Sequence, residues 1–356
     1  MTIEQTAWGS VDDQPVDLFT LTNAHGLVTR IATFGATVVE LHVPDRRGRL
    51  ADVALGFDTL DEYVRTPRYF GATVGRVGNR IADARFELAG RRFDLSANHG
   101  RHHLHGGRKG WDKVVWAAEP IETANGPSLL LGLQSADGDE GYPGTIDAAT
   151  RYTLTDSNEL VIEMTATTDR TTIVNMVHHT YFNLRSIGGD ILGHELQVTA
   201  DAYTPGMPPD GRMVPVRGTP FDFTDSKPIG RDHQAAGSPG GGAPAGFDSN
   251  WIVNGDPTAL RPVARLADPT SGRVMTLRAN QPGVQFYSGV FLDSTTRGKG
   301  RIHSVSSGLC LEPQAFPNAI NVPDWRDQVI LEPGQTYRHE AVYGFTTTNP
   351  DGPLSG

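Results

Sequence analysis

The sequence has few of the residues on which several common kinds of site depend. Cys310 is the one cysteine among 356 residues, which excludes an intrachain disulfide and a zinc site built from cysteines. No apolar run approaches the roughly 18 residues that a membrane span needs. The first residues, Met1–Gln5, carry neither the basic nor the apolar segment of a secretory signal. We therefore expect a cytoplasmic protein without a membrane segment.

Positive charge is also scarce. The chain has 31 Lys and Arg residues against 41 Asp and Glu residues, so its formal net charge is -10. An acidic protein of this kind repels phosphate backbones and anionic lipids. Neither nucleic acid nor a membrane is an expected partner.

Turn-forming residues are abundant, with 41 Gly and 24 Pro. They separate short runs of β-prone residues, such as 16–22, 27–34, 37–43 and 159–167, and a hairpin pattern at 85–95. Such runs without long helical patterns predict an all-β fold, an antiparallel β-sandwich.

Helical signals are confined to short turns, of which the capping-box pattern from Thr59 to Glu62 is the clearest. We expect one large domain over residues 1–356. The glycine-rich segment 237–246 is predicted to be a flexible loop within it, open to a role as a lid or as an insertion. Residues 347–356 are predicted to be a loose tail.

Two adjacent histidines, His178 and His179, lie in the β-prone stretch 174–184. Histidine exchanges protons near neutral pH and is a common general acid or base. Successive side chains of a strand point to opposite faces, so only one of the two histidines can face a given cleft.

A second group of histidines lies in segment 98–107, which ends in Gly106-Gly107. The segment could form the polar wall of a cleft, an ordinary surface loop or a metal site. His102, His103 and His105 lack the i, i+4 spacing of helical zinc motifs, which disfavours the metal site.

Three further segments carry polar groups. Segment 75–80 lacks the remaining elements of a phosphate-binding loop, but its Asn79 and Arg80 could present donors to ligand hydroxyls. The acidic segment 137–144 lacks the ligands of a calcium loop and predicts a structured turn. Glu312 follows an apolar run; an inward orientation would desolvate it and raise its basicity, whereas many such residues face solvent. Cys310 is expected to be packed.

Seven segments together resemble the aldose 1-epimerase (galactose mutarotase) family, in the order expected of that family. They are Gly78–Ile81, Leu104–Gly107, Asp137–Gly144, Asn175–Leu184, Gly246–Asp248, Gln281–Tyr287 and Leu311–Gln314.

The resemblance implies a large single-domain supersandwich of the galactose mutarotase type. It also implies interconversion of the α and β anomers of a free aldohexose, such as galactose or glucose, without a cofactor or metal. By position, Glu312 is similar to the general base of the family and His179 to its general acid. The matched substrate-binding positions are Arg80, Asn79, His105, Asp248 and Gln285. The expected partner is a free monosaccharide, and the expected assembly is a monomer or a homodimer.

The chain departs from the family pattern at two positions. His178 stands where the family usually has Asn, and Ser249 follows Asp248 where the family usually has His. If alternation holds, His178 points away from the sugar. We further expect kcat/KM to fall at low pH as Glu312 gains a proton, and at high pH as His179 loses one.

Three other functions remain open from the sequence. The first is a non-catalytic sugar-binding protein of the same fold. The second is a hexose-phosphate mutarotase, for which Arg101, Arg108 and Lys109 could supply positive charge. The third is a glycosidase that uses Asp248 and Glu312 as its carboxylate pair.

Overall fold

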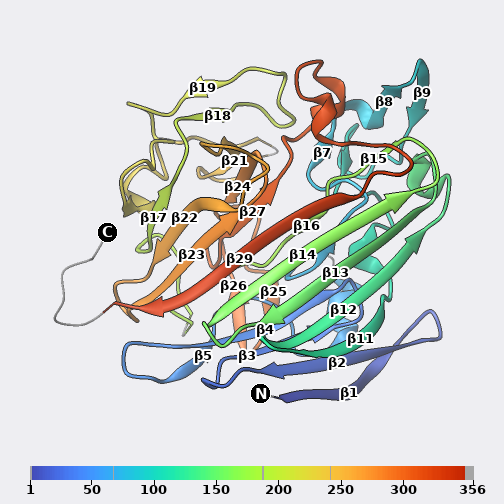
Figure 1. The fold of residues 1–356 in the computed structure, drawn as a ribbon. Helices are drawn as coiled ribbons and strands as arrows, with labels where there is room; N and C mark the ends of the chain where they lie inside the picture. Colours follow the sequence, from blue (N-terminus) through green and yellow to red (C-terminus); the bar gives the residue numbers. More distant parts are fainter. Residues whose placement is uncertain (1, 67, 187, 241, 349–356) are drawn as a thin grey trace.

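The computed structural model describes residues 2–66, 68–186, 188–240 and 242–348. Within them, strands joined by turns form nearly all of the regular structure (Figure 1), and the one α-helix is α1 (Leu60–Arg65). The predicted capping box is confirmed: the Thr59 side chain accepts from the Glu62 amide, and the Glu62 carboxylate accepts from the Thr59 amide. None of the described helices has the length and apolarity that a membrane crossing requires.

The N-terminal sheet is an antiparallel meander, which confirms the strands predicted between residues 16 and 43. Alternate side chains of β2, including Val16 and Leu18, are buried. Gly35, at φ 66°, forms the bend between β3 and β4. The strands in order are β1 (Thr2–Val11), β2 (Gln14–Thr22), β3 (Val28–Ala32), β4 (Thr37–Pro44) and β5 (Leu50–Asp52).

The largest sheet has nine strands, all paired antiparallel, and crosses the front of the molecule in Figure 1. The last strand, β29, lies between β14 and β23 and so joins strands from the two halves of the chain. In spatial order the strands are β11 (Ala117–Thr123), β12 (Gly126–Ser135), β13 (Ile146–Leu154), β14 (Glu159–Thr168), β29 (Tyr337–Thr347), β23 (Arg273–Ala279), β22 (Arg261–Ala267), β17 (Glu195–Val198) and β20 (Lys227–Pro228).

A third sheet packs behind the large one. The hydroxyl of Tyr343, on β29, donates to the carbonyl of Leu311 at 3.0 Å, and a continuous apolar core fills the space between the sheets. This layering confirms the predicted antiparallel sandwich. The strands in spatial order are β19 (Val214–Pro215), β18 (Ala202–Thr204), β21 (Asp248–Ile252), β24 (Gly283–Tyr287) and β27 (Cys310–Gln314).

Short strand pairs connect these sheets. They are β6 (Thr73–Val74) with β16 (Val177–His178), β7 (Arg80–Ile81) with β10 (His103–Leu104), β8 (Arg85–Leu88) with β9 (Arg91–Asp94), β15 (Thr172–Ile173) with β28 (Ile330–Leu331), and β25 (Thr296–Gly298) with β26 (Arg301–His303). The β8–β9 pair confirms the predicted hairpin.

The other described helices are short 3-10 segments, which the sequence patterns did not place individually. They are η1 (Ala82–Ala84), η2 (Trp111–Lys113), η3 (Asp139–Gly141), η4 (Ile229–Arg231), η5 (Ala319–Asn321) and η6 (Arg326–Gln328). The acidic segment 137–144 contains η3 and is a structured turn, in which Asp137 accepts from the Gly144 amide at 2.7 Å.

Two further segments with predictions are the β-prone stretch 174–184 and the glycine-rich segment 237–246. The β-prone stretch 174–184 forms a ladder only at β16, because its other backbone groups bond to loop residues such as Val53 and Ala72. The two ends of the glycine-rich segment 237–246 are joined by a hydrogen bond from the Gly246 amide to the Gly237 carbonyl at 2.9 Å. Its flexibility and its role as a lid or an insertion stay predictions. Most of the predicted tail, residues 349–356, lies outside the described residues.

Candidate active site

A cleft of about 330 Å³ opens between the third sheet, the β7–β10 pair and the loop segments that carry Tyr69 and His179. Every site residue predicted from the sequence lines this cleft, although the residues come from distant parts of the chain. They are Asn79, Arg80, His105, His179, Asp248, Gln285 and Glu312.

Strand register places three of these side chains together. Gln285 on β24 lies directly opposite Glu312 on β27, so the two side chains share one face of the sheet. Asp248 begins the neighbouring strand β21, and its carboxylate accepts a hydrogen bond from Gln285 Nε2 at 2.6 Å. Glu312 therefore faces inward and is only 2% exposed, which rules out the solvent-facing orientation.

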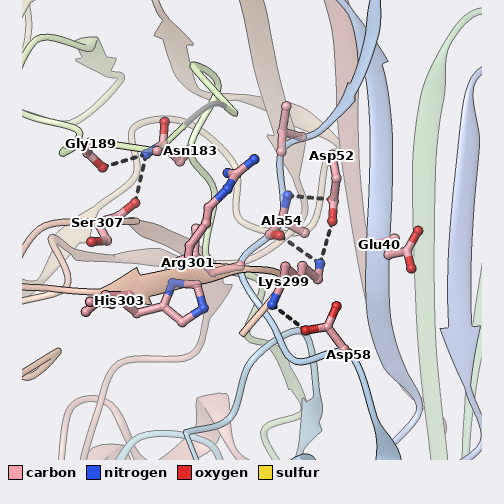
Figure 2. Close-up of a pocket in the computed structure, with 14 residues that line it drawn as sticks. Glu40, Asp52, Ala54, Asp58, Asn183, Gly189, Lys299, Arg301, His303 and Ser307 are labelled. Atoms are coloured by element: carbon pink, nitrogen blue, oxygen red, sulfur yellow. Dashed lines mark hydrogen bonds and ion pairs between the residues drawn. The ribbon is translucent and has the colours of Figure 1, made fainter. Parts of the chain in front are cut away.

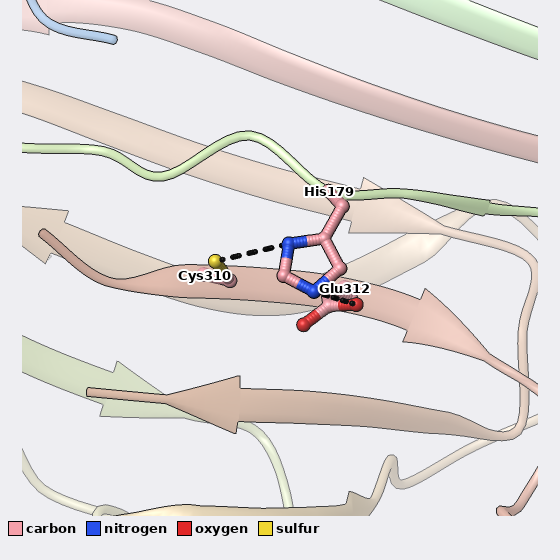
Figure 3. Close-up of side chains that lie close together, drawn as sticks. All are labelled: His179, Cys310 and Glu312. Atoms are coloured by element: carbon pink, nitrogen blue, oxygen red, sulfur yellow. Dashed lines mark hydrogen bonds and ion pairs between the residues drawn. The ribbon is translucent and has the colours of Figure 1, made fainter. Parts of the chain in front are cut away.

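His179 reaches the cleft from the other side. Two hydrogen bonds hold its backbone to the loop that leads into β6. The His179 amide donates to the Ala72 carbonyl at 2.9 Å, and the Gly71 amide donates to the His179 carbonyl at 3.0 Å. Its Nε2 lies 3.6 Å from Oε2 of Glu312 (Figure 3). The two groups can exchange a proton after a small approach, or both can contact one ligand placed between them.

Burial controls how this pair titrates. It raises the pKa of Glu312 well above its ordinary value; the charge of Asp248 adds to the rise, and that of Arg80 opposes it. Burial also lowers the pKa of His179 to about 4, against a smaller opposing effect of its own backbone carbonyl. Both shifts favour the uncharged forms of the pair, in which the carboxyl group holds a proton and the imidazole is neutral. Transfer of that proton to Nε2 produces the carboxylate and histidinium that the sequence led us to expect.

His178 lies on the opposite side of the backbone, as strand alternation predicted. Its Nε2 is 2.6 Å from the Thr180 hydroxyl, and its Nδ1 is 3.4 Å from the Tyr152 hydroxyl. Burial among these groups lowers the pKa of the ring to about 3. His178 is thus part of the core, and His179 alone of the two lines the cleft.

Asn79 and His105 hold each other in place at the cleft wall. The backbone N–H of Asn79 donates to His105 Nδ1 at 3.2 Å, and the backbone N–H of His105 donates to the backbone carbonyl of Asn79 at 3.0 Å. Both residues have positive φ values, 58° and 47°, a costly conformation that commonly occurs at functional sites. The next residue, Gly106, packs against the Gly75 backbone, where a Cβ would lie 1.7 Å from the Gly75 carbonyl oxygen.

The protonation of His105 follows from its contacts. Burial lowers the pKa of the ring well below its ordinary value, and the nearby His179 and Arg80 act in the same direction. Because Nδ1 accepts a hydrogen bond in this neutral ring, Nε2 carries the proton. His105 therefore offers a donor to the cleft.

Arg80 and Asp248 provide the remaining charges. Arg80 Nη2 lies 3.8 Å from Asp248 Oδ2, and both side chains are less than a tenth exposed. Burial raises the pKa of Asp248, while Arg80 and Gln285 oppose the rise. The cleft thus combines charged donors and acceptors, which suits a ligand with many hydroxyl groups.

An aromatic wall of the cleft was missed by the sequence predictions. It consists of Tyr69, Tyr181, Tyr287 and Phe291. Tyr181 stacks on the His179 ring with centroids 5.1 Å apart, and Tyr69 lies 4.6 Å from the His105 ring. Strand alternation could have identified Tyr181, since it lies two residues after His179 and therefore on the same side.

The histidine segment 98–107 is only partly a wall of the cleft. His99 and His105 line the cleft. His103 is buried between the Ser96 carbonyl and the Tyr142 hydroxyl, and His102 accepts from the Asp83 amide. This dispersal explains why the segment does not converge on a common metal position.

A second cavity of about 290 Å³ lies beside β5 and the β25–β26 pair (Figure 2). Its polar groups are largely satisfied by one another. Lys299 Nζ donates to Asp52 at 2.6 Å and to the Ala54 carbonyl at 2.9 Å, while Asn183 bridges to the Ser307 carbonyl. This cavity contains none of the predicted site residues, so the chemistry is assigned to the first cleft.

Known proteins resemble this chain over most of its length. Residues 17–344 match the family model described as aldose 1-epimerase. The chain is 42% identical to the galactose mutarotase of Bos taurus over 321 residues, which cover 89% of this chain and 90% of that protein. It is 37% identical to the aldose 1-epimerase of Haemophilus influenzae over 331 residues, covering 91% and 94%.

Solved structures give the same picture. A galactose 1-epimerase from Lactobacillus acidophilus aligns with a TM-score of 0.83 at 26% identity, covering 97% of this chain and 99% of that one. An aldose epimerase homologue from C. elegans aligns with a TM-score of 0.84 at 28% identity, covering 93% and 99%.

Proposed function

Because the chain belongs to the aldose 1-epimerase family and is a carbohydrate epimerase of the isomerase class, we propose that Glu312 and His179 open and close the ring of a free aldohexose in this cleft. The observation that carries the proposal is the buried pair itself. A proton-accepting and a proton-donating group face each other 3.6 Å apart at the floor of a polar cleft.

The proposed reaction needs two proton transfers. The carboxylate of Glu312 accepts the proton of the C1 hydroxyl while protonated His179 donates to the ring oxygen, and the bond between C1 and that oxygen breaks. After C1 rotates, the oxygen attacks its other face, His179 takes the proton back and Glu312 returns one to the new hydroxyl. Each positioned proton transfer contributes roughly 10²–10⁴-fold to the rate.

The other polar groups suit the binding of the remaining sugar hydroxyls. Arg80 and His105 offer donors, Asp248 offers an acceptor, and Gln285 and Asn79 offer both. The aromatic wall supplies apolar surface for the ring carbons. This division supports a free sugar as the substrate, held by its hydroxyls while C1 is able to turn.

The alternative functions receive less support. A phosphate group would need unpaired positive charge at the cleft, but none of Arg101, Arg108 and Lys109 lines it. Arg101 pairs with Asp83 at 2.8 Å and Lys109 with Asp12 at 3.0 Å. Arg68, which does line the cleft, pairs with Asp293 at 3.3 Å. A glycosidase would need Asp248 free to act, whereas Gln285 and Arg80 engage it. A simple binding protein would not need the opposed Glu312 and His179.

We predict that Glu312→Gln and His179→Asn each lower kcat at least about 100-fold, because each removes one proton transfer. Polarimetry of freshly dissolved α-D-galactose and α-D-glucose measures the rate. Galactose is tested first, since relatives from several mammals are named galactose mutarotase. Glu163→Gln, on the solvent side of β14, is the matched control and should retain wild-type activity.

Wild-type circular dichroism of both variants would show that the fold survives. A Glu312→Gln variant that turns over either sugar at the wild-type rate would refute its role as the base. A hexose 6-phosphate converted faster than both free sugars would instead favour the phosphorylated substrate.

A further inference from the structure

Cys310 lies directly beside the proposed acid and base. It is two residues before Glu312 on β27, so both side chains project from the same face of the strand. Its Sγ is 3.5 Å from Nδ1 of His179, and the side chain is fully buried. Figure 3 shows the His179 ring between the two, with one nitrogen facing the sulfur and the other facing the carboxylate.

This arrangement does not favour a single metal ion, although the three residues are close together. A metal binds an imidazole nitrogen along the outward direction of its lone pair. The nitrogen that contacts Cys310 and the nitrogen that contacts Glu312 point to different sides of the ring. The geometry is that of two separate contacts across one imidazole.

We propose, on the basis of the function assigned above, that Cys310 is a positioning residue whose sulfur accepts the Nδ1–H of His179 and so keeps Nε2 as the nitrogen that exchanges the catalytic proton. A neutral imidazole has one proton, which resides on either nitrogen. Only the tautomer with the proton on Nδ1 presents a lone pair to Glu312 and to the reacting oxygen of the sugar.

The contacts on the other side of the ring support this tautomer. Glu312 Oε2 has no hydrogen-bond partner among the described residues and lies nearest to Nε2. Burial raises the pKa of Glu312 and so favours a protonated carboxyl group, whose proton can be donated to Nε2. The ring proton is then left on Nδ1, opposite the sulfur.

The thiol remains a neutral acceptor. Burial raises the pKa of Cys310 well above its ordinary value, and the charges of Glu312 and Asp248 add to the rise. A neutral sulfur is a weak acceptor, which suffices to orient a ring already enclosed by Tyr181 and Tyr69. The role is therefore one of orientation, since Cys310 makes no proton transfer.

Two substitutions separate hydrogen bonding from packing. Cys310→Ser keeps an acceptor and loses volume, whereas Cys310→Val keeps roughly the volume and removes the acceptor. We expect Cys310→Val to lower kcat about tenfold or more with KM nearly unchanged, a loss typical of removing a group that orients a functional histidine. Cys310→Ser should stay within about threefold of the wild type. The reverse order, or full activity in both variants, would overturn the proposal.

The tautomer itself can be read by ¹⁵N NMR of the histidine side chains at neutral pH, with His179→Asn used for assignment. We expect the Nδ1–H form in the wild type and in Cys310→Ser, and a mixture or the Nε2–H form in Cys310→Val. An Nε2–H tautomer in the wild type would overturn the proposal, as would an unchanged Nδ1–H form in Cys310→Val. If both variants lose activity, this spectrum decides. The measurement is made on the resting protein, so it is distinct from a failure of the Glu312→Gln test.

Discussion

Burial sets the protonation of Glu312 and His179 at the residue scale. From the sequence, Glu312 is expected to titrate below His179, as free carboxylates and imidazoles do. Enclosure between β27 and the aromatic wall reverses the order of the two pKa values, so that the pKa of Glu312 lies above that of His179. The active pair carries one proton in total either way, so the macroscopic pH profile belongs to the pair and not to one residue.

We therefore predict a bell-shaped dependence of kcat/KM on pH with assignments opposite to those expected from the sequence. Below pH about 4 His179 becomes protonated while Glu312 keeps its proton, so the pair holds two protons and lacks its base. Above the raised pKa of Glu312 the pair holds none and lacks its acid. Initial rates between pH 3.5 and 10 would measure both limbs, and a flat profile would contradict the acid–base pairing.

Asp248→Asn tests the assignment of the upper limb. The charge of Asp248 helps to raise the pKa of Glu312, so its removal should move the upper limb to lower pH, whatever happens to the maximal rate. The lower limb should stay in place, since Asp248 is not among the groups that shift the pKa of His179. An upper limb that does not move would mean that another group controls it.

Most of the polar cleft residues could be predicted from the sequence, but their surroundings could not. The resemblance named seven polar residues that line the cleft, because each lies within a short motif, but it did not name Arg68, Asn98 and His99, which line the cleft as well. Of the aromatic wall, Tyr69 and Phe291 were missed because they lie outside those motifs and approach the cleft only through the fold. Tyr181 and Tyr287 lie within the motifs, and their contact with the cleft was not recognised there. The order of the pKa values was missed because enclosure is a property of several segments together.

Among the secondary-structure elements around the cleft, Arg76 links the loop between β6 and β7 to the segment 135–144. It lies between β6 and β7, is 1% exposed, and donates through Nη1 and Nη2 to four carbonyl groups of the segment 135–144. These bonds hold the acidic turn against the loop that carries Asn79 and Arg80. The acidic turn is thus an anchor for the cleft loop.

We predict that Arg76→Leu lowers the free energy of unfolding by about 3 kcal/mol, since buried carbonyl groups left without a donor cost about 1–3 kcal/mol each and partly relax. Urea denaturation followed by fluorescence measures the change. The exposed Arg92, paired with Asp94 on β9, provides the control, and Arg92→Leu should change stability by less than about 1 kcal/mol. Equal losses in the two variants would contradict the anchoring role.

Strand positions were more predictable than strand pairing. Alternating apolar residues identified β2 and β14 in the sequence, because one face of each strand packs on the core. The stretch 174–184 has the same β-prone composition, yet only β16 joins a ladder there. Its environment is set by loops from elsewhere in the chain, which no local pattern describes.

At the scale of the whole molecule, the sandwich depends on contacts between distant segments. β29 closes the large sheet by pairing with both β14 and β23, and β27 completes the sheet that carries Glu312. Composition predicted the class of this fold and the family resemblance its type. The spatial order of the strands required the structure, because antiparallel pairing permits many orders for the same set of strands.

The closed core also buries histidines that must stay neutral. Burial holds the pKa of His178 at about 3 and that of His339 at about 4, below the ordinary value of 6.5. Between these values the unfolded chain binds protons that the folded chain does not, so the free energy of unfolding falls as pH falls from about 6.5. Glu312 acts in the opposite direction, because its raised pKa lets the folded chain bind a proton that the unfolded chain releases.

His178→Asn, which introduces the residue usual in the family, isolates one of these contributions. The free energy of unfolding of the wild type should fall relative to that of the variant by up to about 1.4 kcal/mol for each pH unit below about 6, because the variant has no proton to bind at this position. Urea denaturation at pH 7, 6 and 5 measures both proteins, and His25→Asn, at an exposed histidine, is the control for the substitution itself. Parallel pH dependences of the wild type and His178→Asn would show that His178 is protonated alike in the folded and unfolded chains, contrary to its buried position between Thr180 and Tyr152.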